Sequence, residues 1–331
     1  PGRADNRGTI TTDSLLLGFG SRVIYDLYED FSADQINTKY FYIETKNWQN
    51  GPDYMTPVIE IAYHGEGDIE PGKYLIGKAT EIKGSINNIR IEGVPSNKKA
   101  TLTTENESLY IIIEGMRSAT TINWTGSEST VWDLDNTTNF LKGEEKSTFV
   151  TGDDVFFGDD ATQFNVTINS ELETDTIFVE NTKAYTIQGT GSITGNSMLN
   201  KSGKGLLTIK TENAYTGGNR ISGGAVIVTS LANSTQAKGN LGAVTTNASK
   251  FVIENGGELR TTAAVTNGST IKFESETGGI INNSADFIVD RAMTGTKLTK
   301  KGTGWMKLNV NNTGLNTLVI AAGTVQCINT S

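Results

Sequence analysis

The sequence predicts an all-β protein built as a right-handed parallel β-helix, and three observations support this prediction. The chain has 37 glycines and only 5 prolines among 331 residues, a composition that suits short strands and many tight turns. From residue 163 onward, short β-branched and aromatic runs alternate with Gly and Asn, as expected for strands separated by corners. A segment at 199–232 also recurs at 298–327, which indicates an array of stacked units.

The recurrence needs no gap, because every matched pair is 99 positions apart (298 − 199 = 99). The matched pairs are Leu199/Leu298, Lys201/Lys300, Gly203/Gly302, Gly205/Gly304, Asn213/Asn312, Ile221/Ile320, Gly224/Gly323 and Val226/Val325. A coil of roughly 20 to 25 residues would fit about four or five times into this interval. We expect one supersecondary unit to be used at both places.

Each residue type of the motif has an expected place in such a coil. The glycines are expected at corners that a side chain would resist, namely Gly203, Gly205, Gly217, Gly218 and Gly224. The aliphatic residues are expected to point inward and stack between coils, namely Leu199, Leu207, Ile209 and Ile221. The recurring Lys201 and Lys300 are expected at an edge, with the ammonium group reaching solvent.

Residues 1–115 are predicted to form a separate β-rich unit, either a β-sandwich or the end of a preceding solenoid. The expected strands cover 22–28, 41–44, 58–63, 73–77, 86–93, 100–103 and 109–114. Turns are marked by Pro71-Gly72, Gly84 and 95–97. The spacing of these strands suits both architectures.

Residues 116–331 are predicted to form the β-helical repeat region, because the composition changes at 115–127. The expected strands are 164–168, 176–179, 185–188, 192–194, 206–210, 225–229, 250–254, 270–274 and 287–289. Their short, regular spacing suits successive coils of one solenoid.

Charge and composition exclude several classes of protein. The net charge is −9 and no dense Lys/Arg cluster occurs, so nucleic acid is not an expected partner. No apolar run approaches the roughly 20 residues of a membrane helix, and no membrane insertion is expected. Cys327 is the only cysteine, which excludes an intrachain disulfide. The polar start PGRADNRGTI has no signal-peptide pattern and is expected to be an internal cut through a longer protein.

The motif at 199–226 resembles the autotransporter-associated β-strand repeat, with LNKSGKG, LLTI, Asn213, Tyr215 and the glycine pairs in the family's order. The second copy replaces residues 215–218 by Gly-Leu-Asn-Thr and is degenerate there. Upstream, the segment with Trp124, Trp132, Asn139-Phe140 and GDDVFFGDD resembles the start of such a repeat region. The resemblance implies a large secreted or surface-displayed bacterial protein whose repeat carries no catalytic residue. It also implies flanking domains in the same polypeptide.

Four acidic residues are candidate calcium ligands: Asp153, Asp154, Asp159 and Asp160. The alternative places them in turns that flank the apolar strand at 155–157, with their charges in solvent. Because their spacing does not match an EF-hand loop, the turns explain the sequence better.

Aromatic residues in a polar loop are candidate glycan-binding residues, and Trp48 and Tyr54 are the best examples. Trp124, Trp132 and Tyr215 occupy motif positions, which favours core packing. His64 is the only histidine, so no catalytic triad is expected.

These observations predict a non-catalytic β-helical stalk or adhesin segment that contacts glycans or host-surface components. One alternative is the accessory carbohydrate-binding region of a polysaccharide-degrading enzyme. Another is a β-helix polysaccharide lyase, for which Arg220 or Lys250 would be the base. No cofactor is expected apart from the candidate structural calcium.

Overall fold

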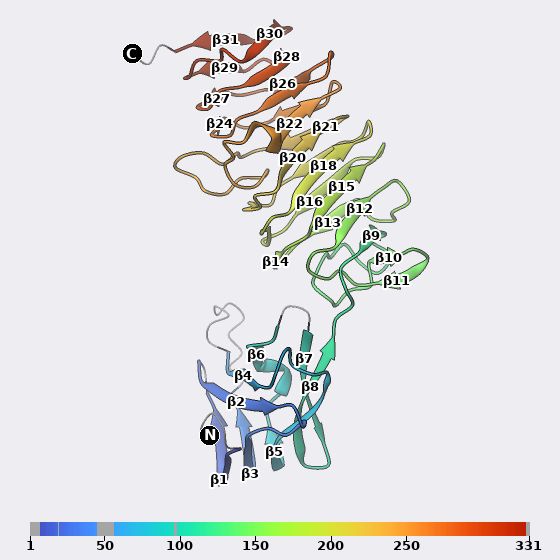
Figure 1. Cartoon of the computed structure of the whole chain (residues 1–331), viewed down its shortest axis with the longest axis vertical. Coiled ribbons are helices and arrows are strands. Elements are labelled where there is room, and N and C mark those ends of the chain that lie inside the picture. The colour runs from blue at the N-terminus through green and yellow to red at the C-terminus, as the bar shows by residue number, and fades with distance from the viewer. Residues whose placement is uncertain (1–6, 19, 45–55, 96–97, 329–331) are drawn as a thin grey trace. The chain divides into compact units, whose positions relative to one another are not determined.

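The computed structural model describes residues 7–18, 20–44, 56–95 and 98–328, which belong to two compact units, Pro1–Arg117 and Ser118–Ser331 (Figure 1). The division lies two residues beyond the expected boundary at 115. The described residues form strands β1 to β31 and two short 3-10 turns, η2 (Ile86–Asn88) and η3 (Ala248–Lys250), and contain no α-helix. Within these ranges, neither helical turn has the length or apolar character needed to span a bilayer.

The first unit consists mainly of parallel strands in two sheets. One sheet contains β1 (Thr9–Leu17), β3 (Gln35–Ile43) and β5 (Gly72–Lys83). The other contains β2 (Arg22–Tyr28), β4 (Val58–His64) and β6 (Arg90–Glu92). The chain alternates between the two sheets, so each pair of strands adds one layer. Of the two architectures left open by the sequence, the parallel pairing matches stacked coils.

An antiparallel hairpin ends this stack. It is formed by β7 (Lys98–Glu105) and β8 (Ser108–Gly115), and β8 pairs with the outer edge of β5. Residues 86–93 were predicted as one strand, but 86–88 form η2 because Ser85 accepts a hydrogen bond from the Asn87 N–H and caps the turn. Only β6 remains extended there.

The second unit is a stack of parallel strands in three groups. Group one contains β9 (Thr121–Trp124), β12 (Asp154–Phe157), β15 (Thr176–Glu180), β18 (Met198–Ser202), β20 (Gly218–Ile221), β22 (Phe251–Glu254), β25 (Lys272–Glu274), β28 (Thr294–Lys301) and β30 (Leu315–Ile320). Group two contains β13 (Asn165–Thr167), β16 (Tyr185–Gln188), β19 (Leu206–Ile209), β21 (Ala225–Val228), β23 (Glu258–Thr261) and β26 (Gly279–Asn283), and it also joins β28. Group three contains β14 (Glu171–Leu172), β17 (Ser192–Ile193), β24 (Val265–Asn267), β27 (Phe287–Val289), β29 (Trp305–Leu308) and β31 (Thr324–Cys327). Figure 1 shows these strands stacked in chain order.

The register gives the length of each coil directly. In group two, Thr186, Thr208, Ile227, Arg260 and Asn282 are successive partners. Their separations are 22, 19, 33 and 22 residues (208 − 186, 227 − 208, 260 − 227, 282 − 260). The long coil contains an insertion at 229–250, which projects from the stack in Figure 1. Two of the other coils, at 22 residues, lie within the expected range of 20 to 25, and the coil of 19 residues is one residue shorter than this range.

The 99-residue recurrence does not equal a whole number of coils. Four ladder steps lead from Lys201 through Ile221, Ile253 and Phe273 to Gly295, which is 94 residues (295 − 201 = 94). Lys300 lies five residues further along β28, where this long strand pairs with group two. The same local motif is therefore used on two different faces of the stack.

One hydrophobic cluster continues through the second unit, from Ile122 to Met306. The four aliphatic residues expected to point inward are at most 3% exposed: Leu199, Leu207, Ile209 and Ile221. Tyr215 and Leu298 are also buried. Ile320 is 53% exposed, because no later described strand pairs with β30 and covers it. An antiparallel hairpin of β10 (Phe140–Lys142) and β11 (Glu145–Ser147) pairs with β9 at the N-terminal end.

Candidate functional site

The residues predicted as a glycan platform, Trp48 and Tyr54, lie outside the described residues. Trp124 and Trp132 pack in the core, where their rings contact Phe140 and Phe157. These two tryptophans offer no face to a ligand.

Most of the four aspartates of the candidate calcium site accept hydrogen bonds from backbone N–H groups. Asp153 is buried and accepts hydrogen bonds from the N–H groups of Thr120 and Val150, at 2.9 and 2.8 Å. Asp154 accepts the Thr176 N–H at 3.0 Å. Burial of Asp153 contradicts the expectation that these charges lie in solvent, and its two N–H donors explain how a carboxylate is accommodated there.

Asp159 binds the next coil in the same way, whereas Asp160 is exposed. Hydrogen bonds from the Lys183 N–H, and then from the Thr182 side chain and N–H, lower the pKa of Asp159. Across the described residues, no three His, Cys, Asp or Glu side chains are grouped to hold a metal ion. The carboxylate oxygens of this cluster are largely engaged by donors of the chain itself.

The candidate residues for acid–base chemistry are also engaged. The His64 Nε2 lies 3.0 Å from Asp26 Oδ1, and its ring stacks on Tyr28 at a centroid distance of 5.6 Å. Arg220 forms an ion pair with Glu254 at 2.6 Å. Lys250 Nζ donates to the Thr216 carbonyl at 2.8 Å.

The recurring lysines are buried, which corrects the expectation that they reach solvent. Lys201 and Lys300 both have 0% exposure. Each lies at i + 2 from a buried leucine, Leu199 or Leu298, so strand alternation directs the lysine inward. Burial lowers the pKa of Lys201 to about 8 and also lowers the pKa of Lys300.

Both ammonium groups bind backbone carbonyls at equivalent corners. Lys201 Nζ donates to the carbonyls of Ser202, Gly203 (3.2 Å) and Gly223 (3.3 Å). Lys300 Nζ donates to the carbonyls of Lys301 (2.7 Å), Gly302 (2.9 Å) and Ala322 (3.2 Å), each 99 residues beyond its counterpart. Each lysine therefore ties the corner of its own coil to the corner of the next.

The corner glycines permit this close approach in two ways. Gly203, Gly224, Gly302 and Gly323 have φ between 57° and 79°, in the left-handed region. Gly205 and Gly304 lack a positive φ, but a Cβ there would lie 2.6 or 2.1 Å from a carbonyl of the coil below. A Cβ at Gly217 would lie 2.2 Å from the Asn196 carbonyl oxygen of the preceding coil. Gly218 combines both reasons, because its φ is 115° and a Cβ there would lie 2.2 Å from the Lys250 carbonyl oxygen.

Two buried asparagines, Asn213 and Asn240, and the partly buried Asn312 organise the irregular corners. Asn213 Oδ1 accepts the Ile193 N–H at 2.8 Å, and Asn312 Oδ1 accepts the Met293 N–H at 2.7 Å. Asn240 performs a related function in the insertion, where its Oδ1 accepts the N–H groups of Thr229 and Ser230. These side chains replace the ladder partners that a corner lacks.

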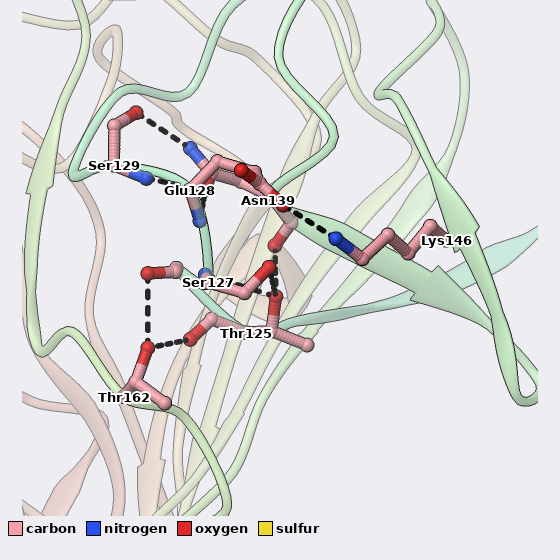
Figure 2. Close-up of polar contacts among 8 residues, drawn as sticks. Thr125, Ser127, Glu128, Ser129, Asn139, Lys146 and Thr162 are labelled. Atoms are coloured by element: carbon pink, nitrogen blue, oxygen red, sulfur yellow. Dashed lines mark hydrogen bonds and ion pairs between the residues drawn. The ribbon is translucent and has the colours of Figure 1, made fainter.

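Asn139 holds the loop at the N-terminal end of the second unit (Figure 2). Its Oδ1 accepts the N–H groups of Glu128 (3.0 Å) and Ser129 (2.9 Å), and its Nδ2 donates to the Val131 carbonyl at 2.6 Å. Lys146 of β11 reaches the same loop through an ion pair with Glu128 at 2.5 Å. The polar groups in this view mainly bind one another, and they therefore form a network that stabilises the loop.

The first unit carries a pair of tyrosines on the outer face of the β1–β3–β5 sheet. Tyr40 and Tyr42 have ring centroids 6.2 Å apart and an interplanar angle of 31°. Lys83 Nζ lies 5.9 and 5.5 Å from the two centroids, and Lys39 Nζ lies 5.0 Å from that of Tyr40. Leu16, the register partner of Tyr42, is 64% exposed. We call these five residues the tyrosine face.

Sequence reasoning missed the tyrosine face, although a signal was present. In KYFYI at 39–43, Phe41 and Ile43 are buried, so Tyr40 and Tyr42 project together from the opposite side. The alternation places the two rings on one surface of the strand, but it does not say which surface faces outward.

The fold and these networks define a class: a nearly all-β protein built from long stacks of parallel strands, similar to a β-solenoid. Comparison with protein-family models, with curated proteins and with solved structures found no match.

Proposed function

We propose that the chain is a non-catalytic segment of a secreted or cell-surface bacterial protein. In this proposal Ser118–Ser331 is a right-handed parallel β-helix related to the autotransporter-associated repeat, and it acts as a stalk. Outward-facing side chains make weak, repeated contacts with glycans or host-surface components.

The observation that carries the proposal is the use of buried and partly buried polar side chains for coil-to-coil contacts. Lys201 and Lys300 bind carbonyls of adjacent corners, and Asn213 and Asn312 bind backbone N–H groups one coil away. A network of this kind makes successive coils one mechanical unit, as a stalk requires. The motif similarity around Leu199 and Leu298 supports the family assignment and the location.

Two measurements test the two parts of the proposal. Pulling a single chain from its ends should unfold residues 118–331 in successive coil-sized steps at high force, whereas extension at low force would contradict a stalk. Beads coated densely with the chain should be retained on glycan-bearing surfaces and released by soluble glycan. The matched control is Trp48→Ala, which removes the predicted loop contact. No retention on any glycan surface would refute the adhesive part and leave the stalk.

A further inference from the structure

The tyrosine face has the geometry of a flat binding platform. Tyr40 and Tyr42 alternate with buried Phe41, so both side chains lie over one side of β3. Their rings are adjacent and inclined by 31° to one another. Exposed Leu16 extends the apolar surface onto β1 beside Tyr42. Aromatic faces of this kind pack well against the C–H faces of pyranose rings.

Two lysine ammonium groups lie beside the tyrosine rings, and they indicate a negatively charged ligand. Lys39 and Lys83 both place Nζ within 6 Å of a tyrosine centroid. Lys83 is partly neutralised by Glu81 at 3.4 Å, whereas no acid among the described residues pairs with Lys39. Lys39, Lys83 and Glu81 together carry one net positive charge beside the rings, in a chain whose net charge is −9. A negatively charged group on a bound molecule would be attracted here.

We propose that the tyrosine face binds an acidic glycan, with consecutive sugar rings over Tyr40 and Tyr42 and a carboxylate or sulfate group near Lys39 and Lys83. This inference rests on the proposed glycan contact and adds its location and the chemical class of the ligand. Stacking on the rings supplies the apolar part of the contact. The two ammonium groups attract the acidic group of the ligand, so an acidic glycan should bind more tightly than a neutral one.

The test measures binding of the full chain to a hexameric oligogalacturonate, a sulfated heparin oligosaccharide of similar length, neutral maltohexaose, and vesicles of phosphatidylserine and phosphatidylcholine. We expect binding to at least one acidic oligosaccharide, stronger than to maltohexaose and weakening as salt rises. Tyr40→Ser and Tyr42→Ser should each weaken this binding about tenfold or more. The Tyr40→Phe and Tyr42→Phe variants keep the rings and should bind like the wild type.

Matched variants separate stacking, charge and general damage. Tyr110→Ser removes a tyrosine that also lies beneath a lysine, Lys73 at 4.0 Å, and should leave binding unchanged. Replacing Lys39 and Lys83 by Gln should reduce the preference for acidic over neutral sugars. Thermal unfolding should be nearly unchanged in the Ser variants, because Tyr40 and Tyr42 are outside the buried core.

The outcomes distinguish this inference from the proposed function. Wild-type binding by both Ser variants, equal binding of neutral and acidic sugars, or binding to anionic vesicles alone would overturn the tyrosine face as an acidic-glycan site. If Trp48→Ala abolishes glycan binding while Tyr40→Ser does not, the proposed glycan contact stands and this inference is wrong. Absence of binding to every glycan overturns both.

Discussion

Replacing Gly224 by alanine tests whether the corners need close backbone approach as well as a left-handed φ. Gly224 has φ 57°, and a Cβ there would lie 2.2 Å from the Gly205 carbonyl oxygen and 2.9 Å from that of Gly203. The first carbonyl accepts the Ala225 N–H, and the second binds Lys201 Nζ. Gly224→Ala must therefore displace two carbonyls that connect coils.

The expected cost has three parts. Forcing alanine into the left-handed region costs about 1 to 2 kcal/mol, of which reduced unfolded-state entropy returns about 0.4 to 1 kcal/mol. Relieving the 2.2 Å contact adds about 1 to 3 kcal/mol of strain, and weakening two hydrogen bonds adds about 1 kcal/mol each. Together these terms lower the free energy of unfolding by about 3 to 7 kcal/mol.

Gly256→Ala is the matched control, because Gly256 has φ 76° but no atom lies within 4 Å of the position that a Cβ would take there. It should lose only about 1 kcal/mol. Urea unfolding followed by tryptophan fluorescence measures both variants. Equal losses in Gly224→Ala and Gly256→Ala would refute the argument that close coil contact requires the corner glycine.

Two further predictions concern buried polar groups. Burial lowers the pKa of Lys201 in the folded chain to about 8, below its ordinary value of 10.5. Between these two pH values the unfolded chain binds more protons than the folded chain. The contribution of Lys201 to the free energy of unfolding therefore rises with pH across this window. The wild type minus Lys201→Met difference in unfolding free energy should therefore increase from pH 8 to pH 10, and a flat difference would show that this lysine does not titrate as proposed. Asn139→Ala should lower the unfolding free energy by about 3 kcal/mol, at about 1 kcal/mol for each of three backbone hydrogen bonds, and should speed amide exchange at Glu128 and Ser129. The exposed control Asn136→Ala, which loses one bond to Asp133, should cost under about 1 kcal/mol, and similar amide exchange in both variants would contradict the role of Asn139.

The strands and corners of the second unit were largely predictable, because their physical causes are local in sequence. Alternation placed Leu207 and Ile209 inward, and the left-handed preference of glycine marked Gly203 and Gly224 as corners. The coil length followed within a few residues from strand spacing. These features depend on two or three adjacent residues, so one sequence was sufficient.

Features that depend on contacts between coils were not predicted. Alternation directs Lys201 inward after Leu199, but only the next corner supplies the Gly223 carbonyl that accommodates its charge. Asp153 is similarly buried because the Thr120 N–H comes from another layer. The shift of the second motif copy to another face arises from the register of β28, which no local pattern specifies.

Only part of the candidate site could be predicted from the sequence. Trp48 and Tyr54 were predicted because aromatic residues in a polar loop are expected to be exposed. The paired rings of Tyr40 and Tyr42 lie within a regular strand, where an aromatic residue is as easily assigned to the core. Burial of Phe41 and exposure of Leu16 were needed to show which side of the strand faces outward.

The central claim, that residues 118–331 form in-register parallel coils, is tested most directly by distances between spin labels along one ladder. The successive group-two partners are Asn165, Thr186, Thr208, Ile227, Arg260, Asn282 and Lys301. Labels at Asn165 and Arg260 are four strand spacings apart, and labels at Asn165 and Lys301 are six, in a Cys327→Ser background that removes the exposed native thiol.

At about 4.8 Å per spacing, the stacked parallel architecture predicts backbone separations of about 19 and 29 Å for these two pairs. The difference of about 10 Å should persist although the insertion at 229–250 lies between the first two labels. Equal distances for the two pairs, or a shorter distance for Asn165 and Lys301, would contradict the stacked parallel architecture.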